Sequence, residues 1–148
     1  MTENNYSLLI KQAESLLSGE SDLIANMANI SSLLFNNIEM VNWVGFYIFR
    51  SSELVLGPFN GQPACTRIPV GKGVCGTAFA EQRTLLIEDV HAFEGHIACD
   101  AASESEVVVP FSRDDYSGVL DVDSPIKGRF GEPERALFEA IAQLISTS

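Results

Sequence analysis

The side chains best suited to chemistry in this sequence are its cysteines and histidines, and several of them share one irregular stretch. Residues His91–Glu106 hold both histidines, His91 and His96, together with Cys99 and four carboxylates. The stretch is too rich in small residues to form a regular amphipathic helix or an alternating strand. A segment of this kind, held by a regular scaffold, is typical of a site loop. We therefore expect it to belong to a functional site.

The three cysteines, Cys65, Cys75 and Cys99, admit three interpretations. Free cysteines are often simply buried. A metal site would need Cys and His ligands in groups of three or four; Cys99 with His91 and His96 is conceivable, but no Cys-x-x-Cys pair is present, so a metal is disfavoured. In the redox interpretation, one thiolate attacks an oxidised substrate and becomes a sulfenic acid, which a second thiol resolves as a disulfide. The third thiol can then take part in exchange.

Two pairs of residues, Asp121 with Asp123 and Trp43 with Tyr47, are spaced so that each pair shares one face of a strand. If Asp121 and Asp123 face a pocket together with Glu106, their repulsion raises at least one carboxyl pKa. The result would be a proton donor near neutral pH or a cradle for an ammonium group; a solvent-facing edge strand is the alternative. Trp43 and Tyr47 would form an aromatic wall for a cation or a polarised methyl group, unless they simply pack in the core.

The hydrophobic pattern predicts the elements that position these residues. Apolar residues recur at helical spacing over 7–18 and, after a cap at Ser21 or Asp22, over 23–38. The rest of the pattern predicts strands at 43–49, 54–56, 64–70, 84–87, 107–111 and 116–123, a loop at 57–63, a short helix at 74–80 and a closing helix after Pro133. Because hairpins outnumber helical crossovers, we expect an α+β fold, with a mostly antiparallel central sheet and the N- and C-terminal helices packed on it.

Length and composition narrow the class of protein. A chain of 148 residues is expected to form one domain. Its net charge of −11 argues against a nucleic-acid partner. No apolar stretch approaches the roughly 20 residues of a membrane span, and the N-terminus does not resemble a signal peptide. With an odd number of cysteines, which fits a disulfide framework poorly, we expect a soluble cytoplasmic protein.

The sequence resembles the free methionine-(R)-sulfoxide reductase family, whose members are built on a single GAF domain. The matching motifs extend over nearly the whole chain: Asn42–Tyr47, Gly57–Cys65, Ile68–Pro69, Gly71–Thr77, Asp89–Phe93, Gly95–Asp100, Ser105–Pro110 and Gly118–Pro125. The three-cysteine pattern is specific, because sensor GAF domains in general do not carry it. The resemblance implies a GAF fold over residues 1–148 and the reduction of free methionine (R)-sulfoxide.

The resemblance also implies a role for each candidate residue. Cys99 resembles the nucleophile, Cys65 the resolving thiol that forms a disulfide with it, and Cys75 an auxiliary cysteine. Glu106, Asp121 and Asp123 resemble carboxylates that contact the substrate and assist protonation of the sulfoxide oxygen, and Trp43 and Tyr47 resemble the aromatic wall of the pocket. The family uses thioredoxin as its reductant, needs no metal or other cofactor, and is typically homodimeric.

A second function remains open at this point. A stand-alone GAF module could bind a small molecule and pass on a conformational signal without catalysis. A requirement for Cys99 would distinguish the two functions, because binding by a sensor should survive Cys99→Ser whereas turnover by a reductase should not.

Overall fold

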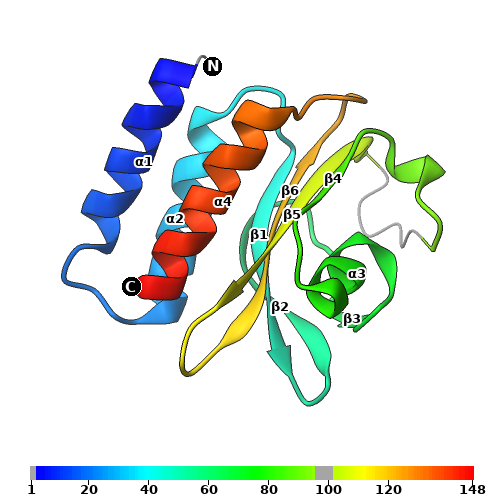
Figure 1. Cartoon of the computed structure of the whole chain (residues 1–148), viewed down its shortest axis with the longest axis horizontal. Coiled ribbons are helices and arrows are strands. Elements are labelled where there is room, and N and C mark those ends of the chain that lie inside the picture. The colour runs from blue at the N-terminus through cyan, green and yellow to red at the C-terminus, as the bar shows by residue number, and fades with distance from the viewer. Residues whose placement is uncertain (1–2, 96–101) are drawn as a thin grey trace.

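A computed structural model of the chain describes residues 3–95 and 102–148 (Figure 1). Its elements are α1 (Glu3–Leu17), α2 (Leu23–Asn37), β1 (Trp43–Arg50), β2 (Glu53–Gly61), β3 (Arg67–Pro69), α3 (Gly73–Glu81), β4 (Leu85–Ile87), η1 (Val90–Ala92), β5 (Ser105–Ser112), β6 (Ser117–Ser124) and α4 (Glu132–Thr147).

These elements form three layers, and the middle layer is a single sheet. The strand order is β3-β2-β1-β6-β5-β4, and the described strands all pair antiparallel. Helices α1, α2 and α4 lie on one side of the sheet and α3 on the other (Figure 1). The predicted α+β fold with an antiparallel sheet covered by N- and C-terminal helices is therefore confirmed.

The terminal helices form where the apolar spacing predicts them. In α2 the stripe Leu23, Met27, Ile30 and Leu34 is buried, and the Asp22 carboxylate caps the helix by accepting a hydrogen bond from the Ala25 amide (2.9 Å). Helix α1 begins at Glu3, before the expected start, and buries Leu9, Ala13 and Leu17 while Leu8 and Leu16 stay exposed. Helix α4 carries Pro133 in its first turn, where its missing N–H is tolerated, and buries Leu137, Ile141 and Ile145.

The strands divide their side chains between two hydrophobic clusters, because successive residues of a strand point to opposite faces. In β1, Val44, Phe46 and Ile48 pack toward the three terminal helices. Trp43 and Tyr47 pack into the cluster on the α3 side. One face of the sheet thus meets the helical layer, and the other receives the candidate site residues.

Strand β2 is longer than predicted, since residues 57–61 continue it rather than forming a loop. This expectation was wrong because Pro58 and Gly57 argue against a central strand, whereas β3 pairs only with Glu53–Val55 and leaves this part of β2 at an edge. The pairing of β1 with β2 also shifts register here, from Tyr47 opposite Leu56 to Gly45 opposite Phe59. A bulge in β2 therefore accommodates the proline.

Cys65 lies outside a strand, contrary to the predicted strand 64–70, because β3 covers only Arg67–Pro69. Two of the carbonyl groups before β3 accept hydrogen bonds from aromatic side chains of β1. The Trp43 indole N–H donates to Gln62 O (3.0 Å), and the Tyr47 hydroxyl donates to Cys65 O (3.0 Å). The loop carrying Cys65 is thereby fixed against the α3 face of the sheet.

Across the described residues, none of the helices combines the length and apolar character needed to cross a membrane.

Candidate functional site

Glu106, Asp121 and Asp123, which we call the carboxyl cluster, lie on the α3 face of β5 and β6. Strand register brings them together: Glu106 stands opposite Asp123, and Val108 stands opposite Asp121. Each is almost fully buried, with 8%, 5% and 8% of its surface exposed. The alternative of a solvent-facing edge strand therefore does not hold, because β6 is flanked by β1 and β5.

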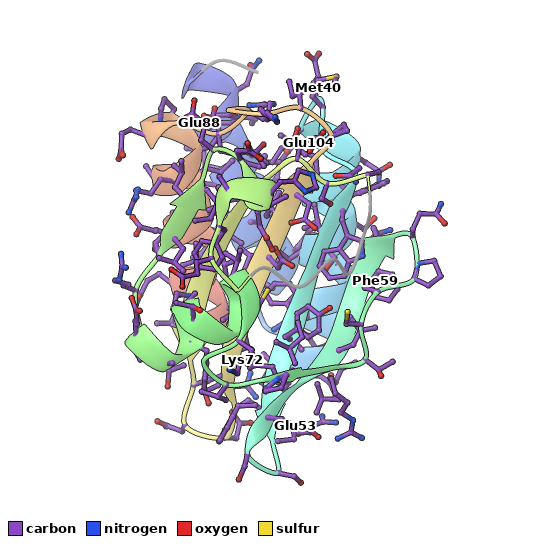
Figure 2. All side chains as sticks on the ribbon, turned by 90° about the vertical axis from the view of Figure 1, so that its right-hand side faces the viewer. Met40, Glu53, Phe59, Lys72, Glu88 and Glu104 are labelled. Carbon is purple, nitrogen blue, oxygen red and sulfur yellow. The ribbon has the colours of Figure 1, made fainter. Side chains whose placement is uncertain are left out.

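An aromatic wall stands beside the carboxyl cluster. Trp43 is opposite Asp123 in the pairing of β1 with β6, and its ring stacks against Tyr47 (6.0 Å between centroids) and Phe59 (5.2 Å). Figure 2 shows the α3 side of the sheet, with Phe59 on β2 at its margin. Phe59 was missed in the sequence because its segment was assigned to a loop.

The wall can pack this closely because residue 45 is a glycine. A Cβ atom at Gly45 would lie 2.3 Å from Cβ of Phe59 and 2.6 Å from Cη2 of Trp43. Any other side chain would push the two rings apart, so the glycine is required by the stacked arrangement.

Cys75 enters the site from α3, which packs over β5 and β6. Its thiol is a buried free thiol, and Sγ lies 3.9 Å from Oε2 of Glu106. Cys65 is half-buried in the loop before β3 and is disulfide-bonded. The two cysteines therefore differ in both exposure and redox state.

Burial and mutual repulsion control the protonation of the site. Burial, followed by repulsion from Asp121, raises the pKa of Glu106 well above its ordinary value. The pKa of Asp121 is also raised well above its ordinary value, first by burial and then by repulsion from Asp123. The pKa of Asp123 is raised in the same way, first by burial and then by repulsion from Glu106. The pKa of the Cys75 thiol is raised by the same two causes. The cluster can therefore hold protons near neutral pH and donate one, or bind a cation that relieves the repulsion.

Two carboxylate oxygens in the cluster have no hydrogen-bond partner among the described residues, namely Oδ1 of Asp121 and Oδ1 of Asp123. The other oxygen of Asp123, Oδ2, accepts a hydrogen bond from the Ser103 hydroxyl (3.3 Å). Buried acceptors are normally satisfied, so these two indicate places where a ligand would supply a donor. Nothing in the sequence indicated a role for Ser103, because only the fold brings it next to Asp123.

The expected site loop His91–Glu106 is described in part. Val90–Ala92 form the short helix η1, and His91 Nε2 lies 2.6 Å from Oε2 of Glu104. Cys99 and His96 lie outside the described residues, so the roles expected for them stay predictions. The structure thus brings together Trp43, Tyr47, Cys75, Glu106, Asp121 and Asp123, with Cys65 held next to them through Tyr47.

Comparison with known proteins gives this arrangement a context. A GAF domain family model matches residues 22–148. Free methionine-R-sulfoxide reductase of Escherichia coli is 50% identical over 141 residues, covering 94% of this chain and 86% of that protein. The structure of fRMsr of Staphylococcus aureus in its reduced form is similar with a TM-score of 0.93 at 54% identity, covering 97% of this chain and 94% of that one.

A third relative was solved with its substrate. The structure of free methionine-R-sulfoxide reductase from Neisseria meningitidis, in complex with its substrate, is similar with a TM-score of 0.93 at 41% identity. The match covers 98% of this chain and 88% of that one.

Proposed function

Because the chain belongs to the GAF domain family and, within it, to the free methionine-R-sulfoxide reductases, we propose that it reduces free methionine (R)-sulfoxide to methionine. The observation that carries the proposal is the buried carboxyl cluster beside the stacked rings of Trp43, Tyr47 and Phe59. A catalyst of this reaction needs an acid for the sulfoxide oxygen and a surface for a polarised sulfur centre, and both are present here.

The free amino acid matches the charge of the site. Its ammonium group would donate hydrogen bonds to the unsatisfied carboxylate oxygens of Asp121 and Asp123. The polarised S-methyl group would rest against the aromatic wall, whose faces carry partial negative charge. Peptide-bound methionine sulfoxide has no free ammonium group, so it would leave the two oxygens unpaired, which is costly in a buried site.

The proposed reaction uses two thiols. The Cys99 thiolate attacks the sulfoxide while a carboxylic acid of the cluster protonates the oxygen, so that methionine leaves and Cys99 becomes a sulfenic acid. Cys65 attacks that sulfur, a disulfide forms, and the oxygen leaves as water. In total, one sulfoxide and two thiols give one thioether, one disulfide and one water.

The disulfide state of Cys65 and the free, buried thiol of Cys75 support Cys65 as the resolving cysteine and Cys75 as an auxiliary one. We further assign thioredoxin as the reductant that resets the enzyme. We also assign a homodimeric assembly, a cytoplasmic location and a single domain over residues 1–148. Helix α1 lies entirely before the matched range, yet its Leu9, Ala13 and Leu17 belong to the same core as α2 and α4, which supports the last assignment.

The decisive experiment measures methionine release from the separated R and S epimers of free methionine sulfoxide, with dithiothreitol as reductant. Release from the R epimer only, abolished by Cys99→Ser, is the expected result. Release from neither epimer by folded, reduced protein would overturn the proposal and favour a GAF module that binds a ligand without catalysis.

A Cys65→Ser variant tests the resolving thiol. It should release about one equivalent of methionine in a single turnover and then fail to recycle with thioredoxin, because the sulfenic acid has lost its partner. Normal thioredoxin-driven turnover by Cys65→Ser would contradict the assignment of Cys65.

A further inference from the structure

We propose that Cys75, Glu106 and Asp121 form a binding site for a thiophilic divalent cation, for which Zn²⁺ is the best match, and that this ion competes with the substrate. One ligand atom of each residue lies within 4.8 Å of those of the other two, and all three side chains are buried. The binding claim is independent of the proposed function, whereas the competition rests on it.

The donor set favours zinc over harder ions. One thiolate and two carboxylates provide sulfur and oxygen at short range, a combination that Zn²⁺ accepts and that Mg²⁺ and Ca²⁺, which take oxygen ligands, do not. The three ligands would leave a fourth tetrahedral position open, as in catalytic zinc sites. This set of ligands was not predicted from the sequence, because Cys75 is far along the chain from Glu106 and Asp121 and meets them only through the packing of α3 on β5 and β6.

The distances between the three ligand atoms are close to those found around a bound zinc ion. Donor atoms around a tetrahedral zinc lie roughly 3.3–3.8 Å apart, given metal–ligand distances of about 2.0–2.3 Å. Sγ of Cys75 and Oε2 of Glu106 are already 3.9 Å apart. The remaining contraction, from at most 4.8 Å, is within reach of small side-chain rotations.

A second observation points to a ligand at this place. Asp121 is only 5% exposed, yet its Oδ1 has no hydrogen-bond partner among the described residues. The neighbouring Asp123 has the same defect at Oδ1. The ion pairs that the described residues form do not involve Cys75, Glu106, Asp121 or Asp123. A divalent ion would supply the missing partner and relieve the repulsion among the carboxylates.

The test titrates reduced full-length protein with Co²⁺, without oxygen and after removal of the reductant. Co²⁺ is a spectroscopic substitute for Zn²⁺, and a thiolate ligand gives it a near-ultraviolet charge-transfer band. We expect the band in the wild type and its loss on addition of Zn²⁺. It should be absent in Cys75→Ser and Cys75→Ala, and present in the matched control Cys65→Ser.

The carboxylates are tested by affinity. Glu106→Gln and Asp121→Asn should each weaken Co²⁺ binding by at least about tenfold, since even residues that only support metal ligands account for effects of this size. They also keep the proposal falsifiable if both Cys75 variants fail to fold. A band that persists in Cys75→Ser, a band lost in Cys65→Ser, undiminished affinity in both carboxamide variants, or equal competition by Mg²⁺ would overturn the proposal.

Competition is measured last, by adding free methionine (R)-sulfoxide to the Co²⁺-loaded protein. Loss of the band as the sulfoxide concentration rises supports a shared site, and an unchanged band overturns the competition. A protein that binds Co²⁺ through Cys75 but reduces no sulfoxide would refute the proposed function and leave the metal site standing.

Discussion

Glu106, Asp121 and Asp123 couple the stability of the protein to the chemistry of its site. Their pKa values are raised in the folded state, first by burial and then by repulsion within the cluster. The folded protein therefore keeps protons that the unfolded chain releases above about pH 4. This contribution to the free energy of unfolding is complete below that pH and is lost as the pH rises through the raised pKa values.

Replacing Asp123 by Asn tests this coupling. The change removes one ionisable group from the cluster, so we expect the wild type to lose stability relative to Asp123→Asn as the pH rises from about 4 to 8. Urea unfolding across this range measures the difference, and the exposed Asp114→Asn serves as the control. Parallel pH profiles for Asp123→Asn and the wild type would contradict the raised pKa.

The same variant should slow catalysis. Loss of a positioned proton donor costs roughly 10²- to 10⁴-fold in rate, so kcat for methionine (R)-sulfoxide should fall by about 10²-fold or more in Asp123→Asn. Steady-state kinetics measures the effect, and an unchanged kcat across the pH range would exclude Asp123 from the chemistry.

At the scale of elements, the bulge in β2 determines the geometry of the aromatic wall. The register shift between Gly45 and Tyr47 places Phe59 opposite Gly45, where its ring stacks on Trp43. Since the bulged residue is in β2, the alternation of β1 is intact and Trp43 and Tyr47 remain on one face. Phe59 is thus a positioning residue, which acts through Trp43.

Truncating Phe59 to Ala should loosen the wall without removing an acid or a thiol. We expect KM for methionine (R)-sulfoxide to rise about 2- to 10-fold, the equivalent of one aromatic pair, with little change in kcat. The matched control is Phe49→Ala, which breaks another stacked pair, with Phe79 at 5.0 Å, outside the site. Equal effects of the two variants on KM would show that Phe59 acts only through stability.

The elements show where sequence reasoning succeeds and where it stops. Period-two and helical patterns predicted β1, β6, α2 and α4, because each buries a continuous face. They failed for residues 57–61, since a proline's effect depends on whether its strand is at an edge, which is a property of the sheet. They likewise predicted that Asp121 and Asp123 share a face, but not that Cys75, on a separate helix, would lie beside Glu106.

At the scale of the whole molecule, α1 packs on α2 and α4, and a hydrogen bond links it to α4. The Tyr6 hydroxyl donates to Oε2 of Glu134 (2.6 Å), and the Gly131 amide donates to Oε1 (2.7 Å). Burial alone would raise the pKa of Glu134, but these two hydrogen bonds and the Arg129 guanidinium lower it below its ordinary value. Glu134 therefore stabilises the fold at pH values above the pKa that its carboxyl has in the unfolded chain. This contribution is lost as the pH falls through the lowered pKa of the folded state.

Tyr6→Phe should therefore show a pH dependence opposite in sign to that of the carboxyl cluster. We expect a loss of about 1.5–3 kcal/mol in the free energy of unfolding at pH 7, typical of a hydrogen bond to a charged group, and a smaller loss at pH 3. Urea unfolding at both values measures it. Tyr116→Phe is the control, because the Tyr116 hydroxyl donates no hydrogen bond within the described part of the chain, and a pH-independent cost of Tyr6→Phe would contradict the role of Glu134.

Trp43 gives the protein a built-in optical reporter. It is the single tryptophan of the chain, and it lies within the site, 1% exposed and stacked against two aromatic rings. All indole fluorescence therefore arises beside the carboxyl cluster. Its intensity and wavelength register events at that cluster, such as ligand arrival, metal loading or a change of protonation, without an attached label.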